Sequence, residues 1–276
     1  MRGAEPDPGE APYPVVVCSH GHRASRFQSA CWCDRLASHG YVVAAPDHTF
    51  NTVFDFDDDR TAEVALNRPR DVSAALDYLI ELNDRGGDPL GGLLATDRAA
   101  VAGHSFGGWT AAAVAGWEVQ SLPLVEPEEL EELGVEPPLD LSDGRFSASI
   151  SMTPAGPSFM GTDGLEKIQM PVLYFGGEWD GVCPPDEDVV PMYEHTPPPT
   201  HLVMVAEAGH YGFSNMCDLL PGMFDDCGPP SRPAGEVQEI AHAYPLDFLG
   251  LHVRGHDRYG DTLSSPPLLE GVAVPP

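Results

Sequence analysis

The feature that most constrains the fold is a series of short apolar runs in which hydrophobic residues do not alternate with polar ones. Turn residues bound these runs, and stretches with helical spacing separate them. Strands have this composition when both of their faces are buried, as in a parallel sheet that helices cover on both sides. The sequence therefore predicts an α/β fold with an open, mostly parallel central sheet flanked by helices. The expected strands are Val15–Cys18, Tyr41–Ala45, Ala99–Gly103, Ala148–Met152, Pro171–Gly176 and His201–Val205.

Helical spacing follows most of these strands. The expected helices are Gln28–His39, a helix that opens at Pro69, Phe106–Gly116 and Glu236–Val253. A glycine ends the first helix, and proline is common at the first position of a helix, as at Pro69. The polar, Asp-rich residues 47–67 are expected to form an excursion before that helix, and Pro245 is expected to bend the last one.

No interior linker or internal repeat divides the chain, so residues 1–276 are expected to form a single domain. Residues 117–146 contain the acidic run EPEELEELGVEPP, which we expect to be a short exposed helix within a long connection. Such an acidic insertion is either a partial lid over a site or a solvated surface segment, and the sequence leaves both open. Residues 1–13 and 262–276 are expected to be flexible tails.

The charge of the chain excludes several classes of partner. It has 14 basic and 43 acidic residues, which gives a formal net charge of −29. Nucleic acids and anionic membrane surfaces are bound by basic side chains, so neither is an expected partner. A GC-rich coding sequence and adaptation to salt both produce such an acidic composition, and the sequence does not separate them. The sequence leaves the oligomeric state open.

A G-x-S-x-G pentapeptide spans Gly103–Gly107, with Ser105 at its centre. The pentapeptide follows an apolar strand and opens an Ala-rich helix, which is the setting in which a sharp turn exposes a strained serine. Glycine is needed at both ends because the turn brings strand and helix too close for a Cβ atom. We therefore interpret Ser105 as a nucleophile.

A serine nucleophile needs a base, and the base needs an orienting acid. With a serine on such a turn, the acid and then the histidine follow in chain order, each just past a strand end. Asp180 follows the run PVLYFGG and is the expected acid, with Glu178 as its nearest rival. His210 follows HLVMV in a glycine-flanked loop and is the expected base.

Acyl transfer also needs donors for the oxyanion of the tetrahedral intermediate. One donor should be the backbone N–H of Phe106, directly after the nucleophile. The second should be the backbone N–H of His22, because Gly21 lets the chain turn inward after the first strand. The His22 side chain either lines the substrate pocket or is an ordinary polar loop residue.

The six cysteines contain one candidate disulfide. Cys217 and Cys227 bracket a loop, and no C-x-x-C pair suggests structural zinc. A disulfide is typical of oxidising compartments, which favours export. The first 14 residues show neither the basic nor the apolar region of a signal peptide, so localisation stays open.

One pattern resembles the start of a calcium-binding loop. Asp55, Asp57 and Asp59 give D-x-D-x-D, but Arg60 stands where glycine is needed and Leu66 where glutamate is needed. We interpret this stretch as a solvated loop and expect no metal ion.

Several strings together resemble one enzyme superfamily: VVVCSHGHRAS, RLASHGYVVAAPDH, RPRDVSAALDYL, VAGHSFGGWTA, PVLYFGGEWD and EAGHYGF. They look like the α/β-hydrolases, in particular the dienelactone-hydrolase-like branch that is similar to platelet-activating-factor acetylhydrolases. Bacterial cutinases and polyester hydrolases share part of the pattern. The resemblance covers roughly residues 13–260 and implies a carboxylic-ester hydrolase with an acyl-serine intermediate and no metal or cofactor.

The resemblance has departures and further implications. Dienelactone hydrolases use cysteine where this chain has Ser105, and members of the superfamily carry strands before Val15, so Tyr41–Ala45 is expected at a sheet edge. Polyester hydrolases place aromatic side chains beside the serine, a role for Phe106, Trp179 and, unless it packs within its helix, Trp109.

The expected substrate is a small or lipid-like ester, with a polyester as the alternative. An acidic surface repels carboxylate chain ends, and this ranks the polymer second. A catalytically silent binding protein with the same fold is the alternative from another class.

Overall fold

The computed structural model describes residues 5–122, 125, 127–264 and 271–274 of the chain. Within them, a seven-stranded sheet has the strand order β2-β1-β3-β4-β5-β6-β7. Neighbouring strands are parallel except β6 and β7, which pair antiparallel. All six expected strands are present, which confirms the α/β class. The strands are β1 (Tyr13–Ser19), β2 (Val42–Ala44), β3 (Leu94–His104), β4 (Phe146–Met152), β5 (Val172–Gly177), β6 (Thr200–Val205) and β7 (Val272–Ala273).

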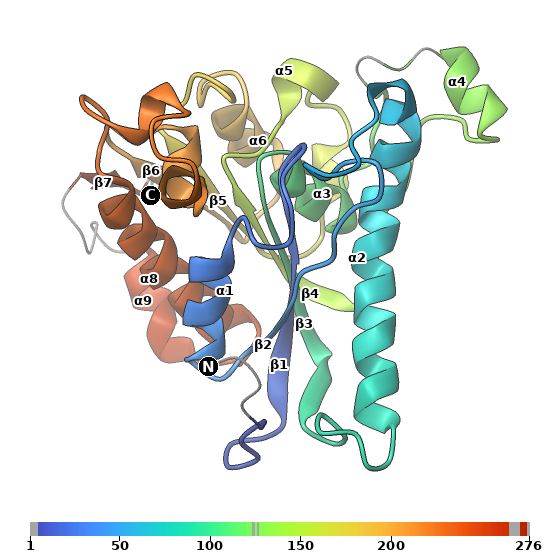
Figure 1. Ribbon diagram of the computed structural model, residues 1–276, viewed down its shortest axis with the longest axis vertical. Coiled ribbons are helices and arrows are strands. Elements are labelled where there is room, and N and C mark those ends of the chain that lie inside the picture. Colours follow the sequence, from blue (N-terminus) through green and yellow to red (C-terminus); the bar gives the residue numbers. More distant parts are fainter. Residues whose placement is uncertain (1–4, 123–124, 126, 265–270, 275–276) are drawn as a thin grey trace.

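Helices cover both faces of this sheet (Figure 1). Val16 and Cys18 of β1 pack in one cluster with α1 and α8, whereas Val15 and Val17 pack on the opposite face with α2 and α3. Since successive side chains of a strand point to opposite faces, this double cover explains why the apolar runs do not alternate. The α-helices are α1 (Ala30–Ala37), α2 (Thr61–Asp84), α3 (Phe106–Val114), α4 (Pro127–Glu132), α5 (Pro157–Met160), α6 (Val189–His195), α7 (Met216–Leu219), α8 (Ala234–His252) and α9 (Gly260–Ser264). The 3-10 helices are η1 (Asp58–Arg60), η2 (Leu165–Lys167), η3 (His210–Phe213), η4 (Asp225–Cys227) and η5 (Asp257–Tyr259).

The second long helix begins at Thr61, so the prediction that it opens at Pro69 was wrong. Pro69 lies inside α2, where its missing N–H leaves the Ala65 carbonyl without its helical donor. An interior proline costs about 3 kcal/mol in a helix. Burial of apolar side chains in the turns before it, including Val64 and Leu66, offsets that cost. The expected polar excursion of residues 47–67 therefore ends earlier than we predicted.

One edge of the sheet was expected from the sequence, and the other was not. β2 forms one edge, as expected for Tyr41–Ala45. At the other edge, Val272 pairs with Val205 within the segment that was expected to be a tail. Residues 1–4, 265–270 and 275–276 of the two expected tails lie outside the described residues.

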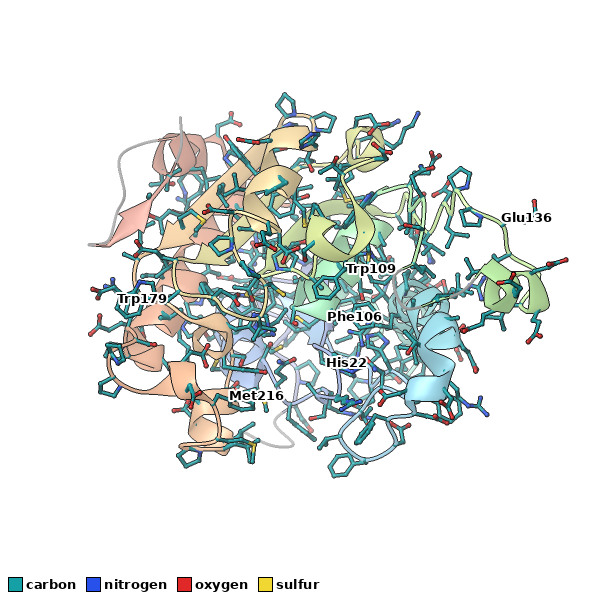
Figure 2. The ribbon with its side chains drawn as sticks, turned by 90° about the horizontal axis from the view of Figure 1, so that it is seen from above. His22, Phe106, Trp109, Glu136, Trp179 and Met216 are labelled. Atoms are coloured by element: carbon teal, nitrogen blue, oxygen red, sulfur yellow. A yellow bond between two sulfur atoms is a disulfide. The ribbon has the colours of Figure 1, made fainter. Side chains whose placement is uncertain are left out.

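The acidic insertion is attached to the domain at its base. Val119 and Leu139 form an antiparallel bridge with N···O distances of 3.0 and 2.8 Å, and Leu130 of α4 is buried. Viewed from above, α4 and the nearby Glu136 lie at the rim beyond α2, to one side of Phe106 (Figure 2). None of the helices in the described residues is long and apolar enough to cross a bilayer.

Candidate active site

Ser105 lies on a sharp turn between the end of β3 and the start of α3. Its backbone has φ 59° and ψ −121°, a conformation that L-residues rarely adopt. A Cβ atom at Gly103 would lie 2.0 Å from the Gly107 carbonyl oxygen, and one at Gly107 would lie 2.0 Å from that of Ser19. Both glycines are thus required by the close approach of β3, α3 and the end of β1. Ser105 itself is half-buried.

Asp180 and His210 form a buried pair at the carboxyl ends of β5 and β6. The His210 Nδ1 atom lies 2.8 Å from Asp180 Oδ2, and both side chains are almost completely buried. The other carboxylate oxygen of Asp180 accepts backbone N–H groups of Val182 and Cys183 at 2.9 and 2.8 Å. These donors stabilise an ionised carboxylate, which holds the ring proton of His210 on Nδ1 and leaves Nε2 as an acceptor. The rival acid Glu178 instead accepts the Glu207 N–H.

The Ser105 hydroxyl forms no hydrogen bond with His210 among the described residues. It contacts the buried thiol of Cys183, and burial raises the pKa of that thiol well above its usual range, so the thiol is protonated. The structure therefore brings the acid and the base together, and it places the serine at the end of β3, which β4 separates from β5 in the sheet.

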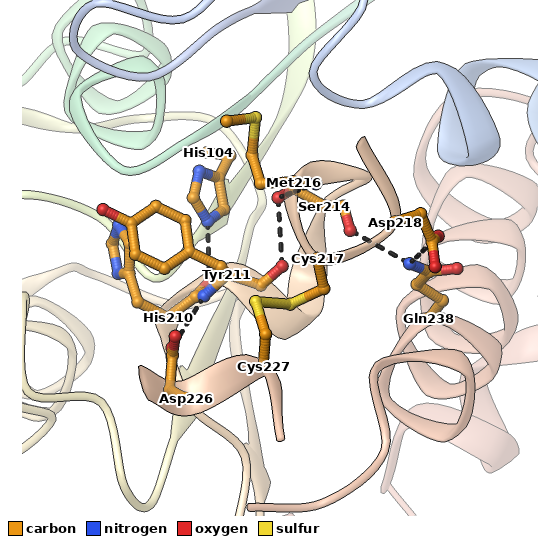
Figure 3. Close-up of a disulfide and its surroundings, with 10 residues drawn as sticks. All are labelled: His104, His210, Tyr211, Ser214, Met216, Cys217, Asp218, Asp226, Cys227 and Gln238. Carbon is orange, nitrogen blue, oxygen red and sulfur yellow. Dashed lines mark hydrogen bonds between the residues drawn. A yellow bond between two sulfur atoms is a disulfide. The ribbon is translucent and has the colours of Figure 1, made fainter. Parts of the chain in front are cut away.

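A disulfide lies close to the loop that carries His210 (Figure 3). Cys217 and Cys227, the expected pair, are joined with a Cα–Cα distance of 5.2 Å. The Tyr211 N–H donates to Asp226 at 3.0 Å, which ties η3 to η4. A short loop of this kind adds about 2 to 3 kcal/mol of stability through chain entropy alone. The disulfide thus reduces the freedom of the segment that follows His210.

A buried hydrogen-bond chain connects this loop to the loop after β1. Gln28 accepts the Gly21 N–H at 2.6 Å and lies 3.0 Å from His104 Nδ1. The other nitrogen of His104 lies 2.9 Å from the His210 carbonyl oxygen. Burial lowers the pKa of His104 to about 3, so this ring is neutral, with the proton on the nitrogen that faces the carbonyl. His104 therefore supports the backbone of His210.

The two expected oxyanion donors are available. Among the described residues, neither the His22 N–H nor the Phe106 N–H donates to a protein acceptor, whereas the Gly21 N–H is taken by Gln28. The exposed His22 ring lies edge-on to the half-buried Phe106 ring, with centroids 6.1 Å apart.

The expected aromatic residues occupy different surroundings. Phe106 stacks on Trp109, which is fully buried, so Trp109 packs within the fold and is not available to contact a substrate. Trp179 is 41% exposed in the loop that carries Asp180. Figure 2 shows His22 and Phe106 near the centre of the top face and Trp179 to one side.

Sequence reasoning missed a second Ser-His-Asp arrangement. Ser19 Oγ lies 2.9 Å from His48 Nε2, and His48 Nδ1 lies 2.8 Å from Asp71. Ser19 is only 2% exposed, and the guanidinium of Arg68 donates to its hydroxyl oxygen at 3.1 Å. A usable signal was present, because Ser19 and His48 each follow an expected strand.

Arg68 is a charged residue near the second arrangement with no exposed surface. Burial lowers its pKa to about 9, so the guanidinium is still positively charged at neutral pH. Burial also raises the pKa of Asp71 to about 6, which leaves this carboxylate mostly ionised at neutral pH.

Comparison with known proteins agrees with this architecture. Residues 6–124 match a family model described as PET hydrolase-like. Cutinase 2 of Thermobifida cellulosilytica is 36% identical over 96 residues, which are 35% of this chain and 32% of the cutinase. Cutinase est2 of Thermobifida alba is 27% identical over 213 residues, 77% of this chain and 57% of the relative.

The chain therefore spans about a third of the first cutinase and just over half of the second. These matches point to polyester hydrolases and cutinases and give no specific support to the dienelactone-hydrolase-like branch. The mostly parallel sheet with helices on both faces is consistent with an α/β-hydrolase fold, and the matches make the chain similar to PET hydrolase-like proteins and to cutinases.

Proposed function

We propose that this protein is a serine carboxylic-ester hydrolase in which Ser105 is the nucleophile, His210 the general base and Asp180 the orienting acid. The observation that carries the proposal is the buried Asp180–His210 pair at the carboxyl ends of β5 and β6, the same end of the parallel sheet at which β3 leads into the strained Ser105 turn. The similarity to cutinases and to the PET hydrolase-like family supports the same reaction.

The reaction begins when Ser105 rotates its hydroxyl from Cys183 towards His210. Catalytic hydrogen bonds often form only once substrate is bound. His210 Nε2 takes the hydroxyl proton while the serine oxygen bonds to the ester carbonyl carbon. The proton then passes from His210 to the leaving alkoxide, which departs as the alcohol and leaves an acyl-serine. Water attacks the acyl-serine with His210 again as base, and this releases the acid and restores the hydroxyl.

The backbone N–H groups of His22 and Phe106 stabilise the oxyanion that forms on the carbonyl oxygen. Each such donor contributes about 3 kcal/mol to the transition state. Both donors are unengaged within the described chain and lie on segments anchored by the sheet. The Asp180 carboxylate meanwhile stabilises the imidazolium that His210 becomes.

Ser105 is preferred over Ser19 as the nucleophile because of what surrounds each hydroxyl. Ser19 is buried, and a donor from a buried cation occupies its oxygen. A hydrogen bond from a positive group withdraws electron density from that oxygen and weakens it as a nucleophile. Ser105 is half-buried, on a turn whose following N–H is free to serve as an oxyanion donor.

The substrate we propose is a small or lipid-like ester. Trp179 and Val182 are 41% and 47% exposed on the loop that carries Asp180, and they offer apolar contacts to an acyl chain. The net charge of −29 disfavours binding of carboxylate-bearing products. A polyester is the second candidate, favoured by the names of the cutinase relatives and of the PET hydrolase-like family.

A panel of p-nitrophenyl esters of increasing acyl length, together with a polyester film, tests the proposal. Wild-type protein should hydrolyse at least one soluble ester, and S105A and H210N should each lose at least 1,000-fold in kcat. Release of acids from the film at a comparable rate per enzyme would favour the polyester. Absence of turnover on the whole panel would favour the catalytically silent binding protein.

A further inference from the structure

The guanidinium of Arg68 is completely buried, yet its nearest partners are neutral. It donates to Thr110 Oγ1 at 3.0 Å, to Asn51 Oδ1 at 2.6 Å and to Ser19 Oγ at 3.1 Å, and it also donates to the His20 carbonyl. No ion pair joins Arg68 to a carboxylate within the described residues. A buried charge without an adjacent counter-ion costs several kcal/mol, so its presence here needs a reason.

The nearest counter-ion of Arg68 along its hydrogen bonds is Asp71, which is reached through three hydrogen bonds in series. Arg68 donates to the Ser19 oxygen, so the Ser19 hydroxyl proton points to His48 Nε2. The remaining ring proton of His48 then lies on Nδ1 and points to Asp71. The second Ser-His-Asp arrangement thus has a consistent direction of donors, from the guanidinium to the carboxylate, and it holds the cation in place without neutralising it by contact.

The partners of Arg68 fix the loop that supplies the first oxyanion donor. Arg68 holds the carbonyl of His20, and Asn51, itself bound to Arg68, lies 2.9 Å from the His22 ring. The Gly21 carbonyl lies 2.7 Å from His20 Nδ1. Because C=O and N–H of a trans peptide point in opposite directions, anchoring the Gly21 carbonyl also sets the direction of the His22 N–H.

The same guanidinium contacts the residue that supplies the second donor. Its central carbon lies 4.5 Å from the centre of the Phe106 ring. Thr110, one turn further along α3, is both an acceptor for Arg68 and a donor to the Phe106 carbonyl at 2.8 Å. Arg68 therefore lies between the two segments that present the oxyanion donors, and it is bonded to both.

We propose that Arg68 is a positioning residue for the reaction. It fixes the orientation of the two segments that carry the His22 and Phe106 N–H groups, and it places a positive charge without a contacting counter-ion near the oxyanion. The inference rests on the proposed function. A positive charge fixed in a site of low polarity stabilises negative charge that forms only in the transition state. Its effect should therefore be on kcat and not on substrate binding.

The test compares R68M and R68K with R145M as a matched control. Arg145 pairs with Asp77 and Asp143 in a surface network that contacts none of the catalytic residues. Turnover of a p-nitrophenyl ester is measured per active site, with sites counted by burst titration, so that unfolded protein does not contribute. We expect R68M to lose at least 100-fold in kcat with KM within threefold of wild type, R68K to recover part of the loss, and R145M to keep the wild-type kcat.

The rate of fluorophosphonate labelling should fall in parallel in R68M, because phosphonylation uses the same donors. A kcat per site within threefold of wild type in folded R68M would overturn the inference, and so would a rise in KM at unchanged kcat. If R68M does not fold, N51A replaces it, with a fall in kcat of at least fivefold at unchanged KM expected and a kcat within twofold contradicting the role. Wild-type protein that neither turns over esters nor takes the label would refute the proposed function itself, which is a distinguishable outcome.

Discussion

Lowering the pH from about 8 to about 5 should destabilise the folded protein, because several of its histidines, including His20, His48 and His104, are buried without a proton. Burial lowers the pKa of His20 to about 2 and that of His104 to about 3. The unfolded chain binds protons at both positions below about pH 6.5, whereas the folded protein does not until the pH falls near 3. The contribution of neutral His20 and His104 to stability is therefore complete above about pH 6.5, and it is lost as the pH falls from about 6.5 towards their pKa values in the folded protein.

The magnitude follows from proton linkage. At pH 5, a histidine that is protonated only in the unfolded chain lowers the free energy of unfolding by about 2 kcal/mol, so the two together lower it by about 4 kcal/mol. Asp71 acts in the opposite sense, because its pKa is raised to about 6 and the folded protein takes up its proton first. Its side chain is 35% exposed, so we reduce its contribution to about 1 kcal/mol. These three groups together give an expected net loss of about 3 kcal/mol, and His48, whose pKa burial also lowers, adds to it.

Urea unfolding followed by tryptophan fluorescence, at constant ionic strength and several pH values, measures this loss. The H104Q variant is the control, because glutamine keeps one donor and one acceptor but does not titrate. Relief of acidic self-repulsion affects both proteins equally and cancels in the difference. Between about pH 8 and pH 5, wild type should lose about 2 kcal/mol more than H104Q. Equal losses in the two proteins would refute the argument that His104 is neutral when folded.

Three further predictions concern the site and its supports. D180N should lower kcat by about 1,000- to 10,000-fold with little change in KM for a p-nitrophenyl ester, and a loss below about tenfold would argue against Asp180 as the orienting acid. C217S should lower the free energy of unfolding in urea by about 2 to 3 kcal/mol, and an unchanged midpoint would contradict a stabilising disulfide. G107A should cost more than about 3 kcal/mol or prevent folding, since its Cβ would overlap the Ser19 carbonyl, whereas G235A, which meets no atom, should keep wild-type solubility and stability.

Most of the sheet could be predicted because its evidence is local. Val15 to Val17 are apolar at every position, and the structure buries them on two faces. The start of α2 could not be placed by the same reasoning, since Pro69 is typical of a first helical turn and only tertiary burial of Leu66 overrides that preference. β7 was missed because a two-residue strand depends on pairing with a distant segment.

In the candidate site, too, local sequence predicted some residues and not others. Ser105, Asp180 and His210 each follow an apolar strand, so the fold class alone predicted that they would lie together at the carboxyl ends of the strands. The network around Arg68 depends on segments that approach one another only in three dimensions. Nothing in the local sequence marks Arg68 as buried, because an arginine in an amphipathic helix is normally solvated.

The most direct test of the account is the position of a fluorophosphonate label. Folded wild-type protein is treated with the probe, digested, and mapped by mass spectrometry. One adduct is expected, on the peptide that contains Ser105, and none in S105A or in protein unfolded in urea. An adduct on the peptide that contains Ser19, or folded protein that takes no label, would contradict the assignment of Ser105 as the nucleophile.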